Sequence, residues 1–181
     1  MLPRTSAEAG RAAIIALACA AIAAASHLFS IASAVPPATW WPMGVALGGM
    51  IAFGRVVWPG IFLGWMAGAL IAGLGPAAVV SAATGTGAAL AGAWLAARLR
   101  LGPGLDRFRD VGLLMGVIVP GTALAAGLGD ALLLLVPGIA PDHAAPGAVV
   151  LGRWLGCVFS GFALVPLMTV SYTHLRAHET K

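Results

Sequence analysis

Long apolar runs separated by short breaks dominate the chain. An α-helix needs about 20 apolar residues to cross the hydrocarbon core of a bilayer. Most of the runs approach that length, and prolines such as Pro36 and Pro37 stop one helix before the next begins. We therefore predict an all-α, polytopic transmembrane bundle of about six spans. The predicted spans are residues 12–34, 39–54, 56–73, 76–97, 111–136 and 147–170.

We expect departures from a regular transmembrane helix in the second and fifth spans. Residues 39–54 form a short run, which either crosses the membrane with little tilt or forms a re-entrant hairpin with residues 56–73. Both arrangements leave the direction of the later spans unchanged. Pro120 lies inside the fifth span and predicts a kink there, because proline cannot donate a backbone hydrogen bond within a helix.

The composition agrees with a membrane protein and narrows the classes of function. Of 181 residues, 60% are hydrophobic and 9% charged, with a mean hydropathy of +0.98, whereas soluble proteins carry about 25% charged residues. The arginines form no broad basic face, so we expect the lipid bilayer, and not nucleic acid, as a partner. Cys19 and Cys157 lie inside apolar runs, which argues against a disulfide framework. We expect no metal and no cofactor.

The arginines predict which way the bundle faces. With the N-terminus inside, the predicted external loops 35–38, 74–75 and 137–146 contain no Lys or Arg. By the positive-inside rule, both ends of the chain are then expected in the cytoplasm. The arginines of the predicted cytoplasmic stretches are Arg4, Arg11, Arg55, Arg98, Arg100, Arg107 and Arg109.

Small residues recur at every fourth position in three of the predicted spans. This spacing lets the backbones of neighbouring helices approach closely in lipid, so we predict a tightly packed bundle. The glycines expected at these contacts are Gly44 and Gly48 in the second span, Gly60, Gly64 and Gly68 in the third, and Gly152 and Gly156 in the sixth.

The ionisable residues His27, Asp130 and Arg153 lie within predicted spans. Charge is costly inside a membrane, so each is a candidate functional residue. A short loop joins the fifth and sixth spans, which are therefore expected to be antiparallel neighbours with Asp130 and Arg153 at similar depth. We predict that these two side chains pair, with Cys157 on the same helical face as Arg153. The pair is either a structural clamp or part of a polar pocket that senses a ligand or ion.

Enzyme signatures are missing from the sequence. It contains no Gly-x-Ser-x-Gly elbow, no phosphate-binding Gly-x-x-x-x-Gly-Lys loop and no His-Glu-x-x-His motif. An intramembrane serine protease would require Ser160 to meet a histidine. We predict that this chain has no catalytic activity of its own.

The composition changes abruptly after Val170, which suggests three segments. Residues 171–181 contain the only Tyr and the only Lys of the chain, and they resemble a translated sequencing adapter. We interpret them as a non-native tail and exclude them from fold reasoning. Residues 1–11 are then a cytoplasmic N-terminal segment, and residues 12–170 are one membrane domain.

Several motifs resemble the type-one membrane-associated sensor family of bacteria. The most specific is a Trp-Pro-x-Gly entry followed by a Gly-x-x-x-Trp-Pro-Gly turn. Asp110-Val111 after a basic loop, and Arg153-Trp154-Leu155-Gly156 with Pro166 beyond, resemble two later stretches of the family. Cys157 stands where the family tends to carry an acidic residue. The signature residues are Trp41, Pro42, Gly44, Gly54, Trp58, Pro59 and Gly60.

This resemblance implies a sensory module of the bacterial inner membrane. Such modules feed a cytoplasmic output domain, which is a histidine kinase or a domain that makes or degrades cyclic-di-GMP. The family domain is usually longer, so the resemblance also implies a truncated chain. We leave open whether it forms a homodimer. The alternative is a six-span substrate-binding subunit of a transporter, which length, span count and glycine content fit equally.

Overall fold

The computed structural model describes residues 41–71, 73–102, 105, 107–133 and 146–179, together with scattered positions between 6 and 25; for Leu133, Pro146 and residues 172–179 only the backbone is described. Every regular element in this part of the chain is a helix, which confirms the all-α prediction there. The predicted first span, 12–34, lies mostly outside these residues. Its described positions Ala18 and Ile22 are helical and pack against the main core.

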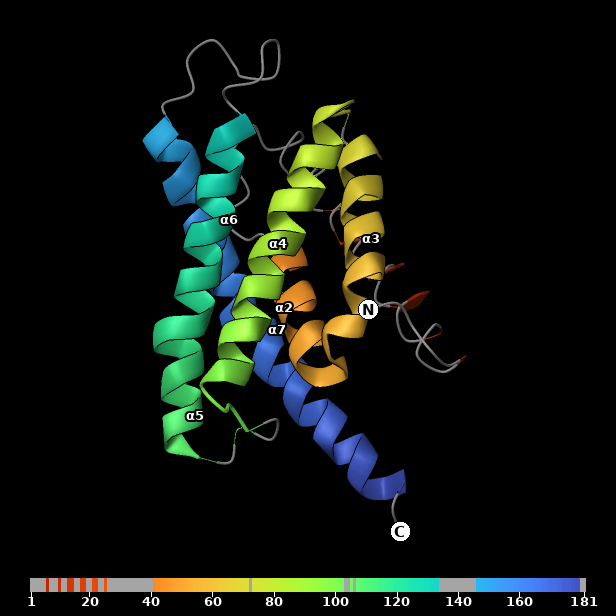
Figure 1. Cartoon of the computed structure of the whole chain (residues 1–181), viewed down its shortest axis with the longest axis vertical. Coiled ribbons are helices and arrows are strands. Elements are labelled where there is room, and N and C mark those ends of the chain that lie inside the picture. The colour runs from red at the N-terminus through yellow and green to blue at the C-terminus, as the bar shows by residue number, and fades with distance from the viewer. Residues whose placement is uncertain are drawn as a thin grey trace.

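Three helices are long and apolar enough to cross a membrane, by length and composition. They run side by side along the long axis of the molecule (Figure 1). Their positions agree with the predicted spans 76–97, 111–136 and 147–170 to within a few residues, apart from the far end of the last. These helices are α4 (Ala77–Arg98), a continuous helix made of α5 (Phe108–Leu113), η2 (Leu114–Ile118) and α6 (Val119–Leu133), and α7 (Pro146–Glu179).

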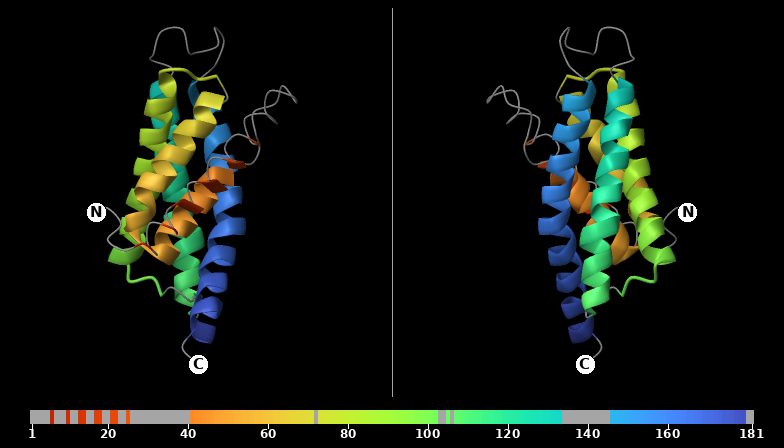
Figure 2. Two further views of the ribbon diagram at one scale, coloured as in Figure 1. Left: turned by 90° about the vertical axis from the view of Figure 1, so that its right-hand side faces the viewer. Right: turned by 90° about the vertical axis from the view of Figure 1, so that its left-hand side faces the viewer.

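The helices at the second and third predicted spans are shorter than expected. α2 (Trp41–Phe53) has 13 residues and α3 (Trp58–Ile71) has 14. At 1.5 Å per residue each is about 20 Å long, which is less than the hydrocarbon thickness of about 30 Å. Figure 2 shows α2 running obliquely through the bundle toward the end where α7 finishes. The described residues therefore do not confirm about six full spans.

Glycine and proline set the break between α2 and α3. Gly54 has φ of +83°, a left-handed conformation that side chains disfavour, and it ends α2. A short 3₁₀ turn, η1 (Arg55–Val57), follows at once. Pro59 then lies in the first turn of α3, where its missing N–H is not needed. The motif singled out in the sequence is thus a tight turn between two helices.

The core lies where α2 and α4 meet their neighbours. α4 packs against α2, α3 and α6, and α7 packs against α2 and α6. Residues 42–50 of α2 are buried without interruption, so this short helix is enclosed on all sides. A helix that is apolar all round is expected in such a position.

Gly44 and Gly48 lie where α2 meets α7. A Cβ atom built on Gly44 would overlap the carbonyl oxygen of Ser160 in the α7 backbone. A Cβ on Gly48 would lie 3.0 Å from Sδ of Met168. These two glycines therefore permit the close approach of α2 to α7 that their spacing predicts.

Pro120 distorts its helix over the preceding turn. Residues Leu114–Ile118 form a π-helical turn, one residue wider than the α-helical turns on either side. Pro120 lacks an N–H for the carbonyl of Gly116, and its ring crowds that carbonyl. The distortion at the predicted kink is thus a widened turn.

The backbone of α7 stays helical well beyond Val170, through Glu179. The sequence predicts a non-native tail from Ser171, but the helix does not end at that residue. Pro166 is accommodated inside this helix, where Thr169 donates hydrogen bonds from Oγ1 to the carbonyls of Val165 and Pro166 at 2.9 and 3.1 Å.

Candidate functional site

An ion pair joins α6 to α7 inside the apolar bundle. Nε of Arg153 lies 2.7 Å from Oδ2 of Asp130, and the two side chains are only 10% and 17% exposed. Both residues lie within candidate spans, toward the end where α6 finishes and α7 begins. The structure thus brings together the two residues that the antiparallel arrangement predicts as partners.

Trp65 of α3 forms a further wall of this site. Cζ of Arg153 lies 5.7 Å from the centre of the Trp65 ring, a distance at which a cation is attracted to the π face. Trp65 is fully buried. A Cβ on Gly85 of α4 would overlap the Trp65 ring, so that glycine creates the space for the indole. The cation on α7 is therefore held by residues from two other helices, α6 and α3, and α4 shapes the wall.

A second polar contact joins α7 to the start of α6, about 15 Å along α6 from Asp130. The indole Nε1 of Trp154 donates a hydrogen bond of 3.1 Å to the carbonyl of Pro120. Arg153 and Trp154 are adjacent in sequence, so two successive residues of α7 bind the same neighbouring helix. This arrangement fixes the rotation of α7 about its own axis relative to α6.

The next turns of α7 carry Cys157 and Ser160, both buried. Cys157 follows Arg153 by one turn and belongs to the main hydrophobic core. Oγ of Ser160 donates a hydrogen bond of 3.0 Å to the carbonyl of Cys157 in its own helix. That bond is a usual way to satisfy a serine inside an apolar helix.

His27 and the other histidines, His143, His174 and His178, lie outside the described side chains. The functional role of His27 in a polar pocket therefore stays a prediction. Within the described residues, no three His, Cys, Asp or Glu side chains gather closely enough to hold a metal ion.

The other predicted packing glycines differ in their surroundings. Gly60, Gly64 and Gly68 of α3 and Gly156 of α7 are buried. Gly152 behaves differently, because a Cβ built there meets nothing within 4 Å. The prediction that Gly152 lies at a close contact between helices is therefore wrong for the described residues. One turn further along α7, Gly156 on the same face is buried.

Sequence reasoning missed Trp65 and the close contacts of α4. Nothing in the spacing of Trp65 along the chain links it to Arg153. Gly129 of α6 packs on Thr84, where a Cβ would lie 2.7 Å from the Thr84 Cβ. In α4, small residues recur at every fourth position and are all buried: Ser81, Gly85, Ala89 and Ala93. That pattern was present in the sequence and predicts close packing of α4 against its neighbours.

At the other end of the bundle, arginines surround the turn between α4 and α5. We call this the arginine-rich end, defined by Arg55, Arg98, Arg100, Arg107 and Arg109, all exposed. Buried Asp110 holds the turn, since its Oδ2 accepts a hydrogen bond of 3.3 Å from the backbone N–H of Gly102. Arg109 donates to the carbonyl of Leu99 at 3.4 Å. The described ends of α6 and α7 near the ion pair carry no Lys or Arg up to Arg153 itself.

In this geometry the position of Arg153 depends on the charge and position of Asp130. A buried charge pair that loses one partner leaves a costly lone charge, so any event that neutralises or displaces Asp130 also changes the position that Arg153 prefers. No family model, curated protein or solved structure matches the chain.

Proposed function

We propose that this chain is the membrane-embedded sensory module of a bacterial signalling protein, with both ends of the chain in the cytoplasm. The observation that carries the proposal is the course of α7. This one helix bears Arg153 of the buried ion pair near its first turns and runs without a break to the arginine-rich end (Figure 1). A change at the ion pair therefore has a continuous helical path along the whole bundle.

The mechanism we propose is a shift between two packings of α7. In one state Arg153 is paired with Asp130 and stacked on Trp65, and in the other a stimulus has changed the charge or position of Asp130. Ligands act by favouring one of two existing states, and helix shifts of 1–2 Å at packed interfaces are a common form of such a switch. In the intact protein α7 would pass this shift to a cytoplasmic kinase or cyclic-di-GMP domain.

The orientation can be tested with two single cysteines in a background where Cys19 and Cys157 are alanine. Phe108 is 94% exposed at the arginine-rich end, and Pro76 is exposed at the opposite end. We expect Pro76→Cys, and not Phe108→Cys, to react with an impermeant maleimide added to whole cells, because the positive-inside rule places the arginines in the cytoplasm. The reverse pattern would contradict this topology.

The sensory role can be tested by joining a diguanylate cyclase reporter to α7 after Val170. We expect Arg153→Met to change the basal output at least about twofold, because it removes the contact that fixes α7 against α6. One alanine inserted at the junction rotates the reporter by about 100° and should change the output as well. Val117→Ala, at a half-exposed position of the widened turn, is the control and should leave it unchanged.

Correctly inserted variants that all give the same output would contradict the sensory proposal. Coupling of the ion pair to the output is the property that separates a sensor from a transporter subunit, because a subunit that only binds substrate need not pass a shift along α7.

A further inference from the structure

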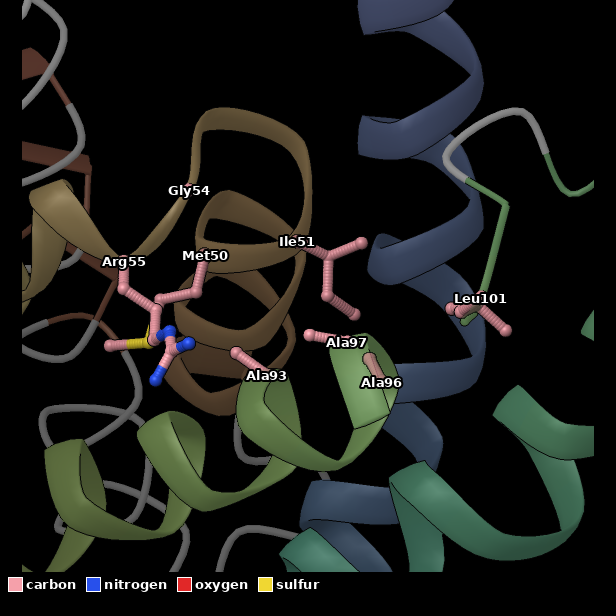
Figure 3. A pocket seen from close by; sticks show the side chains of 8 residues that line it. All are labelled: Met50, Ile51, Gly54, Arg55, Ala93, Ala96, Ala97 and Leu101. Atoms are coloured by element: carbon pink, nitrogen blue, oxygen red, sulfur yellow. The ribbon is translucent and has the colours of Figure 1, made fainter. Parts of the chain in front are cut away.

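A cavity of about 310 Å³ opens at the arginine-rich end, away from the ion pair. It lies between the end of α2, η1 and the last turns of α4 (Figure 3). Figure 3 shows Arg55 and Met50 on one side of the cavity and Ile51 and Leu101 on the other. Alanines of α4 form the wall between them, so a single guanidinium faces an otherwise apolar space.

The small residues of α4 make this space. Ala93 and Ala96 are buried while Ala97 is exposed, and none of them fills the gap left where α2 ends at Gly54. Gly54 and Arg55 are exposed as well, so the cavity is accessible from outside the bundle. Ligand cavities in proteins begin at about 300 Å³, so this one suits a headgroup and not a whole lipid.

The exposed charges that the structure describes around the cavity are all positive. Among the described residues only Arg153 forms an ion pair, so the guanidinium of Arg55 is not neutralised by any described carboxylate. Asp110, the one described acid at this end, is buried and accepts a hydrogen bond from Gly102. Arg98 and Arg100 lie at the end of α4, just before Leu101, and add to the positive potential.

The backbone beside the cavity places an arginine where glycine is usual. Arg100 has φ of 55° at the end of α4, and the amides of Arg100 and Leu101 close the helix by bonding to the carbonyls of Ala97 and Ala96. Glycine is favoured at this left-handed position because it has no Cβ. An arginine here keeps a positive charge beside the cavity at the expense of a less favourable backbone conformation.

We propose that this cavity binds the phosphodiester headgroup of an anionic phospholipid from the surrounding membrane, with Arg55 as the main phosphate ligand. A guanidinium is well suited to phosphate oxygens. Basic pockets between transmembrane helices at the cytoplasmic side are suited to such headgroups. The apolar wall made by Met50, Ile51 and Leu101 suits the glycerol and first methylenes of the lipid. This site is independent of the sensory role.

Native mass spectrometry of the full chain in detergent, titrated with phosphatidylglycerol or phosphatidylcholine, tests this site. We expect tighter binding of phosphatidylglycerol, and Arg55→Gln should raise its dissociation constant about tenfold, the loss expected for one charge-assisted hydrogen bond. Arg107→Gln makes the same change in charge outside the cavity and should raise it less than about threefold, as a surface charge would. Ala97→Phe should block binding with every charge kept.

Three results would overturn the proposal. The first is equal weakening by Arg55→Gln and Arg107→Gln, which means a general attraction to the basic end. The second is unchanged binding in Ala97→Phe, which excludes the cavity; this variant also decides the matter if Arg55→Gln aggregates on gel filtration. The third is competition by glycerol 3-phosphate at the same concentration as the lipid, which would assign the site to a free phosphate ester.

Discussion

Arg153→Met should destabilise the bundle more than any other single change to the candidate site, by about 3 to 5 kcal/mol in the free energy of unfolding. The substitution removes the partner of Asp130, whose side chain is only 17% exposed. It also removes the cation that faces the Trp65 ring. Asp130 is too short to reach the membrane surface, so its charge would stay buried without its partner or be lost to a proton.

Asp130→Leu should lower the free energy of unfolding by less, because the Arg153 side chain can change its conformation. Its long side chain can extend toward the nearby surface, and its guanidinium can keep the contact with Trp65. Unfolding by sodium dodecyl sulfate in mixed micelles, followed by tryptophan fluorescence, measures both variants. A larger loss for Asp130→Leu than for Arg153→Met would contradict this account of which charge is trapped.

Gly44→Ala should lower the free energy of unfolding by about 1 to 3 kcal/mol, the usual range for overpacking a core. The new methyl group would overlap the carbonyl oxygen of Ser160, which belongs to the backbone of α7 and cannot rotate away. The same mixed-micelle titration measures the effect, and α2 must move away from α7 to make room.

Gly152→Ala is the matched control, since it is the same substitution inside a helix. Nothing lies within 4 Å of the Cβ that it adds. Alanine is the better helix former by about 1 kcal/mol, so this variant should be as stable as the parent or slightly more so. Equal losses of stability at Gly44 and Gly152 would contradict this prediction, because they would show that the contact with Ser160 does not decide the result.

Features that depend on span length, on depth in the membrane or on a single proline could be predicted from the sequence. Apolar run length located α4, the helix from Phe108 to Leu133, and most of α7, because hydrophobic span length is set by the membrane. Depth and antiparallel order were enough to pair Asp130 with Arg153. The missing N–H of Pro120 was enough to place a distortion in its helix.

What the sequence could not supply depends on rotation about helix axes and on contacts distant in sequence. Gly152 and Gly44 lie in similar four-residue repeats, yet only Gly44 faces a neighbouring backbone. Trp65 meets Arg153 only because Gly85 of a different helix leaves room for its ring. The oblique course of α2, enclosed by α4 and α7, likewise follows from the packing of the whole bundle.

The coupling between Asp130 and Arg153 is the most direct test of the site on which the proposed switch depends. A double-mutant cycle of Arg153→Met, Asp130→Leu and the combined variant measures it by the same titration. We expect the combined variant to recover at least half of the loss caused by Arg153→Met, because an apolar pair replaces the ion pair without leaving a lone charge. Losses that simply add would mean that the two side chains do not act as a pair, and the proposed switch would have no basis.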